Sequence, residues 1–143
     1  MKFSKDTVID GMITSASQLK KGMAVYHVYG VSQTFNPEKE TLVTDVLTYP
    51  EWKKLNNEQY KPGTLSLDCS KWIEVEYFSS YVKKTVRTAR SLGDCGIDSE
   101  SEGGPYNYNR LFTSEESARQ YWQMCQDAKI PESYYYLNYD CTD

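Results

Sequence analysis

The strongest periodic pattern of hydrophobic and polar residues lies at positions 113–128. Its apolar members are Ala118, Tyr121, Trp122, Cys125 and Ala128. Spacings of three and four place these side chains on one stripe of an α-helix. Thr113 followed by Glu116 predicts a capping box at the start of this helix, and Pro131 prevents its continuation. We therefore expect an amphipathic helix whose apolar ridge, centred on Trp122, is buried against the rest of the chain.

Two strands are predicted in the first half of the chain. Residues 23–31 are rich in β-branched and aromatic side chains and are apolar on both faces, which is typical of a central strand. A turn at 36–39 and a second apolar stretch at 42–49 predict an antiparallel hairpin. Residues 51–60 are expected to form either a short helix or a loop.

A second hairpin is predicted further along the chain. Residues 72–78 alternate apolar side chains with Glu74 and Glu76, and a reversal at 79–80 leads into a return strand at 81–90. Basic residues of the return strand lie opposite the two glutamates. Such cross-strand pairs stabilise a ladder by roughly 0.2–1 kcal/mol, which supports the pairing.

Strands followed by a helix predict an α+β domain. We expect a small curved antiparallel sheet, with a further strand within 106–112, and one main C-terminal amphipathic helix packed on it. A length of 143 residues suits one domain, and no linker divides the chain. Residues 1–143 are therefore predicted to form a single domain.

Charge and targeting signals narrow the class of protein. The formal net charge of −4 argues against a general phosphate-binding surface. The chain shows neither a signal peptide nor an apolar run long enough to span a membrane, so we expect a cytoplasmic protein. In that reducing compartment the four cysteines, Cys69, Cys95, Cys125 and Cys141, are expected to be free thiols.

Signals for catalysis, metal binding and cofactor binding are weak. His27 is the only histidine and has no nucleophile motif beside it, so no catalytic residue is predicted. A pairing of His27 with a thiol distant in sequence stays open. Asp98, Glu100 and Glu102 resemble the start of a calcium loop, but the position of the final bidentate glutamate falls on Asn109. The glycines match no phosphate-binding motif, and we predict neither a metal nor a cofactor.

Tyrosine is unusually abundant, at 13 residues. Tyrosine buries its ring while its hydroxyl keeps a polar partner, which suits both the sheet faces of a small domain and protein–protein contacts. With catalysis and phosphate binding disfavoured, the leading interpretation is a non-enzymatic module that binds another protein through outward-facing aromatic residues. The expected contact residues are Trp52, Tyr106, Tyr108, Tyr134, Tyr135, Tyr136 and Tyr139.

Nucleic-acid binding by the strand at 81–90 is the alternative. Aromatic and basic residues interleave there, as in sheets that bind single strands. The residues concerned are Tyr81, Lys83, Lys84, Arg87 and Arg90. Glu74 and Glu76 on the neighbouring strand would neutralise much of this positive potential, which ranks the alternative second. An enzyme acting on a small molecule or nucleotide, or a sponge for one, ranks third.

The second half of the chain also carries a resemblance to known proteins. It includes SLGDCGI at 91–97, YNYNRLF at 106–112 and SEESARQYW at 114–122, after an opening LKKGMAVY at 19–26. These motifs resemble small accessory and host-takeover proteins of large tailed bacteriophages, without indicating a specific family. The resemblance implies a protein that inhibits or modulates a host protein of defence or transcription in the host cytoplasm. It implies no site residues.

Overall fold

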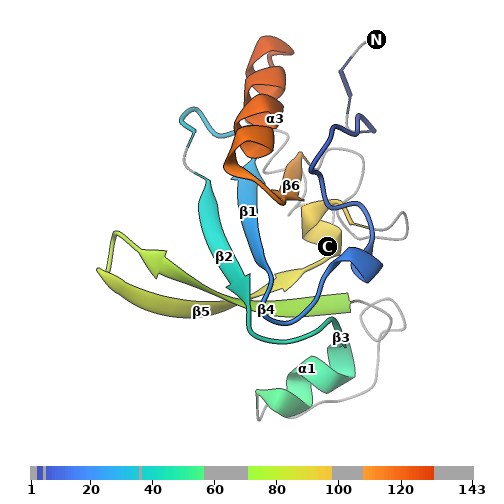
Figure 1. Cartoon of the computed structure of the whole chain (residues 1–143), viewed down its shortest axis with the longest axis vertical. Helices are drawn as coiled ribbons and strands as arrows, with labels where there is room; N and C mark the ends of the chain where they lie inside the picture. Colours follow the sequence, from blue (N-terminus) through green and yellow to red (C-terminus); the bar gives the residue numbers. More distant parts are fainter. Residues whose placement is uncertain (1–2, 5, 36, 57–70, 98–107, 131–143) are drawn as a thin grey trace, which may run out of the picture.

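The computed structural model describes residues 3–4, 6–35, 37–56, 71–97 and 108–130. Within these residues the chain forms a six-stranded antiparallel sheet, two α-helices and two 3₁₀ helices (Figure 1). The strands are β1 (Ala24–Tyr29), β2 (Glu38–Leu42), β3 (Leu47–Thr48), β4 (Lys71–Ser79), β5 (Lys84–Ser91) and β6 (Asn109–Phe112). The helices are α1 (Tyr49–Leu55), α3 (Glu115–Asp127), η1 (Ala16–Gln18) and η2 (Gly93–Cys95). The predicted α+β class with a C-terminal helix is confirmed.

Strand β1 lies in the interior of the sheet. The strand order is β3-β4-β2-β1-β6, and β5 pairs with the opposite edge of β4. Val25 and Val28 point to opposite faces of β1, and both are buried. The prediction of a central strand covered on both sides is therefore confirmed.

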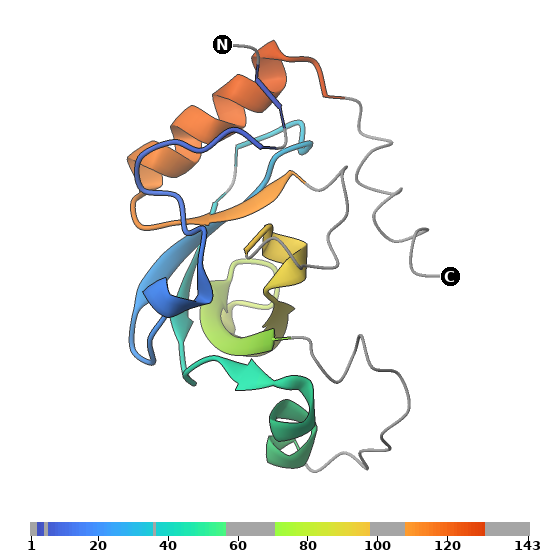
Figure 2. The same ribbon diagram turned by 90° about the vertical axis from the view of Figure 1, so that its right-hand side faces the viewer.

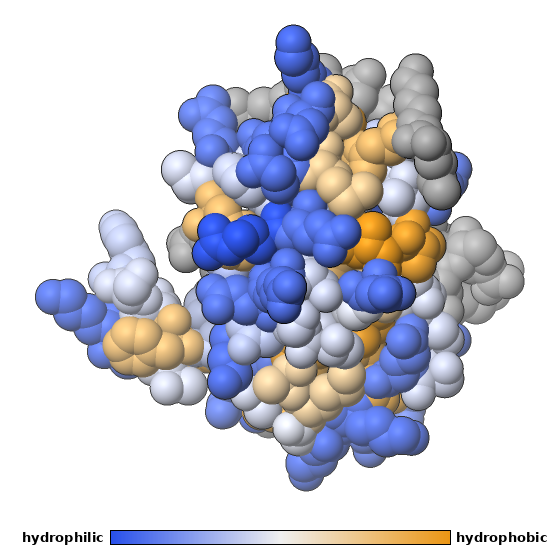
Figure 3. Space-filling view, turned by 45° about the horizontal axis from the view of Figure 1, so that its top comes forward, coloured by the Kyte–Doolittle hydropathy of each residue, from blue (hydrophilic) through white to orange (hydrophobic). Residues whose placement is uncertain are grey.

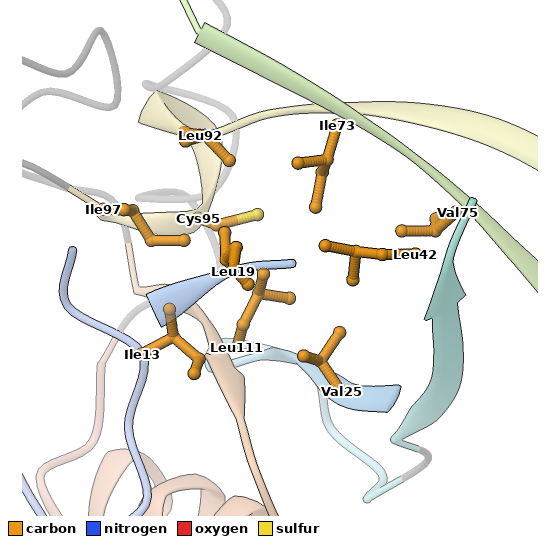
Figure 4. Packing of buried hydrophobic residues seen from close by; sticks show 10 residues of the cluster. All are labelled: Ile13, Leu19, Val25, Leu42, Ile73, Val75, Leu92, Cys95, Ile97 and Leu111. Atoms are coloured by element: carbon orange, nitrogen blue, oxygen red, sulfur yellow. The ribbon is translucent and has the colours of Figure 1, made fainter. Parts of the chain in front are cut away.

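The sheet curves around one hydrophobic core and carries a second core on its other face. The inner core lies among β1, β2, β4, β6 and η2 (Figure 4). It comprises Ile13, Leu19, Val25, Leu42, Ile73, Val75, Leu92, Cys95, Ile97 and Leu111. The outer core lies where α3 packs on β1 and β6, through residues such as Val28, Phe112 and Tyr121. Figure 2 shows α3 at one end of the molecule and α1 at the other.

The start of α3 differs from the predicted start by one residue. The N-cap is Ser114, whose hydroxyl accepts a hydrogen bond of 3.1 Å from the Ser117 N–H. The predicted capping box of Thr113 and Glu116 is wrong. The Thr113 N–H donates to the Gly11 carbonyl at 2.8 Å, so Thr113 is held by the N-terminal segment and the helix is capped one residue later.

The apolar ridge of α3 is centred on Tyr121 and not on Trp122. Tyr121 is fully buried, together with Ala118 and Cys125 on the same stripe. Trp122 is half-buried at the rim, where its indole N–H donates to the Ser32 carbonyl at 2.9 Å. Ala128 is exposed and forms the C-cap.

The predicted antiparallel partner of β1 is present as β2, but it spans 38–42 and not 42–49. The predicted turn at 36–39 is therefore wrong at 38–39, and Asn36 lies outside the described residues. Strand β2 reads EKETL, and Glu40 occupies an inward position beside Leu42. The Arg90 guanidinium pairs with the Glu40 carboxylate, which allows a charged residue to be buried there. This charge at a core position hides the alternation that would have revealed the strand. Of the predicted 42–49 strand, Leu42 ends β2, Leu47–Thr48 form β3, and Tyr49 already belongs to α1.

The second hairpin is confirmed, with a longer reversal than predicted. Its ladder runs from Trp72–Ser91 to Ser79–Lys84. The turn occupies 80–83, and Lys83 adopts a left-handed backbone conformation with φ 58°. Residues 81–83 therefore belong to the turn and not to the return strand.

The short helix expected after the first hairpin begins earlier than predicted. Thr48 caps α1 through a reciprocal pair of hydrogen bonds with Glu51, and Pro50 occupies the first turn. Strand β6 confirms the strand expected within 106–112, although residues 106–107 lie outside the described residues.

Candidate functional site

The β4–β5 hairpin extends beyond the body of the sheet as a two-stranded arm (Figure 1). Strand β2 pairs with β4 only at Leu42–Val75 and Thr41–Glu76. The β4–β5 ladder continues past this point to the Ser79–Lys84 pair. Strand β4 therefore loses its neighbour on one side while it keeps β5 on the other.

A groove lies where β2 and the arm diverge. Its volume is about 760 Å³, which is within the usual range of ligand-binding pockets. The groove is lined by Pro37, Lys39, Thr41, Glu76, Tyr77, Phe78, Ser79, Ser80, Tyr81 and Thr85. One wall is therefore β2 and the segment just before it, and the other wall is the tip of the arm.

The tip of the arm exposes large apolar side chains. Phe78 is 66% exposed, Tyr81 is 93% exposed and Val82 is 47% exposed. In the space-filling view the arm stands out on the left, with hydrophobic atoms next to strongly hydrophilic ones (Figure 3). Aromatic residues gathered on one protruding element, within a polar surround, are typical of a protein-binding surface.

Two of the four basic residues predicted to bind nucleic acid are committed to ion pairs. The Arg87 guanidinium contacts the buried Glu74 carboxylate, and the Arg90 guanidinium contacts the buried Glu40 carboxylate. Lys83 and Lys84 are exposed and make no ion pair with any residue that the structure describes. The predicted basic strand thus reduces to two lysines beside Tyr81.

The predicted protein-binding aromatic residues that the structure describes, Trp52 and Tyr108, do not lie together on one exposed surface. Trp52 stacks on Trp72 with 5.0 Å between ring centroids, and its indole N–H donates to Glu74 at 2.9 Å. Tyr108 is buried in the outer core, so its ring is not available to a partner. Tyr106, Tyr134, Tyr135, Tyr136 and Tyr139 lie outside the described residues.

Sequence reasoning missed Phe78 and Val82. Phe78 shares the face of β4 that carries Glu74 and Glu76, because strand residues two apart point the same way. An aromatic residue at a polar-face position was the signal that this side chain would be exposed. Val82 carried no such signal, because it lies in a turn that was predicted as strand.

His27 lies in a buried charge cluster and not in the groove. Its Nδ1 is 4.0 Å from Oε2 of the Glu40 carboxylate, and the Arg90 guanidinium contacts the same oxygen. Burial, together with the nearby Arg90 charge, lowers the pKa of His27 to about 3, so the imidazole is neutral. None of these three residues lines the groove. The geometry gives the cluster a structural role inside the sheet.

Two thiols are buried in the described part of the chain. Cys95 and Cys125 are both free thiols, as predicted, and both are buried, although burial was predicted only for Cys125; burial raises the pKa of each thiol to about 12. Cys69, Cys141 and the acidic stretch at 98–102 lie outside the described residues.

Neither a group of metal-ligating side chains nor a membrane-spanning helix is present in the described ranges. There, no three His, Cys, Asp or Glu side chains are grouped as metal ligands would be. Helices of sufficient length and apolarity to cross a membrane are also absent from those ranges.

Comparison with known proteins identifies the family. Residues 13–125 match the family described as Phage g100-like protein. The chain belongs to this family. The matched segment of this Phage g100-like protein runs from before β1 into α3 and includes all six strands, and hence the arm. The resemblance to bacteriophage proteins predicted from the motifs is thereby confirmed. No curated protein and no solved structure matches the chain.

Proposed function

We propose that this phage protein is a non-enzymatic binding module that docks on a host protein through the tip of the β4–β5 arm. The observation that carries the proposal is the exposure of Phe78, Tyr81 and Val82 on an element that projects from the sheet. Burying such side chains in an interface contributes about 25 cal/mol per Å² of apolar surface, whereas leaving them in water contributes nothing. The consequence for the host protein is inhibition or modulation, in the host cytoplasm.

Charge supports a protein partner over a nucleic acid. Binding to a phosphate backbone draws on cations that are free to replace its counterions. Arg87 and Arg90 are already engaged by Glu74 and Glu40, and the chain as a whole has a net charge of −4. Hydrophobic contact by the arm does not depend on those cations.

The experiment is affinity capture from host lysate. It compares the wild type with one triply substituted test variant and one doubly substituted control. The test variant is Phe78→Ser/Tyr81→Ser/Val82→Ser. The matched control is Val8→Ser/Leu55→Ser, because Val8 is 64% exposed and Leu55 is 52% exposed at other places on the surface. Exposed substitutions of this kind change stability by about 0.5 kcal/mol or less each, so both variants should fold.

We expect the wild type and the control to retain the same host protein after nuclease treatment, and the arm variant to lose it. Equal capture by all three proteins would show that the arm does not bind the partner. Retention of nucleic acid alone, abolished by nuclease and reduced by salt, would favour the alternative in which Tyr81, Lys83 and Lys84 bind a single strand.

A further inference from the structure

The groove occupies the place where the β2–β4 ladder stops. The observed pairs are Leu42–Val75 and Thr41–Glu76. Continuing the same register would place Lys39 opposite Phe78 and then Pro37 opposite Ser80, and all four of these residues line the groove. Pro37 has no N–H with which to extend the ladder, and the two strands diverge here. The groove therefore opens between β2 and β4 beyond their last observed pair.

Main-chain groups point into this opening from the β4 side. The Val43 N–H donates to the Glu74 carbonyl at 2.9 Å, which shows that Glu74 directs its main-chain groups towards β2. Residues two apart along a strand direct these groups to the same side. Phe78 therefore directs its N–H and carbonyl into the groove.

The same reasoning applies to β2. The Leu42 N–H donates to the Met23 carbonyl at 2.8 Å, so Leu42 directs its main-chain groups towards β1. Thr41 and Lys39 then face the other way, towards β4. Lys39 presents one N–H and one carbonyl to the groove from the wall opposite Phe78.

The side chains around the opening select the chemistry of an occupant. Lys39, Lys83 and Lys84 are exposed, and none of them has an ion pair within the part of the chain that the structure describes. Lys84 pairs with Ser79 in the β4–β5 ladder, and the Lys83 N–H donates to the Ser79 carbonyl at 2.7 Å, so both lysines adjoin the groove. Among the described groove-lining residues, the charged ones are Lys39 and Glu76. Lys39 offsets the Glu76 charge within the described lining, and Lys83 and Lys84 next to it leave an excess of positive charge among the described side chains, which favours an acidic occupant.

We propose that the groove binds an extended, acidic segment of the partner protein, which adds as a short strand between β2 and β4. Its main chain pairs with the groups of Lys39 and Phe78, its acidic side chains lie near the three lysines, and its apolar side chains contact the exposed ring of Phe78. This proposal rests on the proposed function, because it assigns the bound segment of the same protein partner.

The test isolates the main-chain contribution with two substitutions at one position. Lys39→Ala removes the charge and keeps the N–H, whereas Lys39→Pro removes both. The Lys39 N–H does not bond to β1, so proline is tolerated there as it is at a strand edge. Both variants are checked for folding by circular dichroism and then compared with the wild type.

The probe is a yeast-displayed library of short random peptides, from which enriched sequences are synthesised and measured by fluorescence anisotropy. We expect peptides that alternate acidic with β-branched or aromatic residues. Lys39→Ala should weaken the binding of these peptides in a salt-dependent manner. Lys39→Pro should weaken their binding about five-fold more, because one further hydrogen bond is lost. Absence of enrichment, or equal binding by the two variants, would overturn the proposal.

Amide exchange of the free protein supplies a second criterion. We expect the Lys39 and Phe78 amides to exchange rapidly in the free protein and to become protected when peptide is added. Protection in the free protein would show that β2 and β4 close on each other, and competition of the peptide by a single-stranded oligonucleotide would assign the groove to nucleic acid; either result overturns the proposal. If capture of the host protein needs the arm while the two Lys39 variants behave alike, this inference fails and the proposed function stands.

Discussion

Removal of the imidazole at position 27 should change how the stability of the protein depends on pH. His27 is the only histidine in the chain, so no other side chain with an ordinary pKa titrates between about pH 5 and pH 7. It is buried beside Glu40 and Arg90, and its ring meets Tyr29 edge to face at 4.4 Å between centroids. Substitution to phenylalanine keeps a planar ring and removes the titrating group.

The size of the effect comes from the two pKa values. The pKa of His27 is about 3 in the folded protein and 6.5 in the unfolded chain. Below pH 6.5 the unfolded state takes up a proton that the folded state refuses, so stability falls as the pH falls and is lost progressively down to about pH 3. Integrating this difference gives a loss of about 2 kcal/mol between about pH 7.5 and pH 5.

The assay is urea unfolding followed by tryptophan fluorescence at a series of pH values. The wild type should lose about 2 kcal/mol of unfolding free energy across that range, and His27→Phe should lose much less, whatever its absolute stability. A flat profile for the wild type, or an equal slope in the variant, would show that His27 is not held neutral by burial.

Three further predictions concern the two cores and the charge cluster. Tyr121→Ala should cost about 3–5 kcal/mol of unfolding free energy and Trp122→Ala clearly less, because Tyr121 is fully buried and Trp122 is half-buried; the reverse order in urea unfolding would contradict the packing of α3. Glu40→Leu should cost about 3–5 kcal/mol by removing the buried carboxylate that the Arg90 guanidinium contacts, and Glu40→Leu/Arg90→Met should recover most of this; a double variant as unstable as the single one would refute the pairing. The Cys95 thiol should react with a thiol reagent only when the protein unfolds, and rapid labelling of the native protein, read by mass spectrometry, would show that Cys95 is accessible.

Sequence periodicity was sufficient to predict an element wherever apolar residues were buried and polar residues were exposed. The apolar faces of β1, the alternation of β4 and the stripe of α3 each reflect burial that depends on local spacing alone. Hydrophobic period therefore predicted the fold class and the second hairpin.

Long-range ion pairing is what periodicity could not reveal. Strand β2 has a glutamate at a core position, and that position is tolerable only because Arg90, distant in sequence, reaches the same place. The same contact removes Arg90 from the predicted basic surface. The Arg87 pair with Glu74 has a similar effect, although the cross-strand placement of opposite charges was foreseen.

The groove of the candidate site could not be predicted from the sequence, for a geometric reason. Its groove exists because β2 stops pairing with β4 while β5 continues. Pro37 marks the place where β2 can no longer extend the ladder, but this is recognisable only once the partner of β2 is known. Tyr81 was singled out, but as part of a basic strand and not as the exposed tip of an arm.

A photoreactive benzophenone amino acid placed at position 81 in infected cells tests the arm most directly. The matched position is 55, since Leu55 is also an exposed hydrophobic residue. Irradiation at position 81 should yield a covalent adduct with one host protein, and irradiation at position 55 should not. Equal adducts from both positions, or crosslinks at position 81 to nucleic acid alone, would contradict the claim that the arm binds a protein.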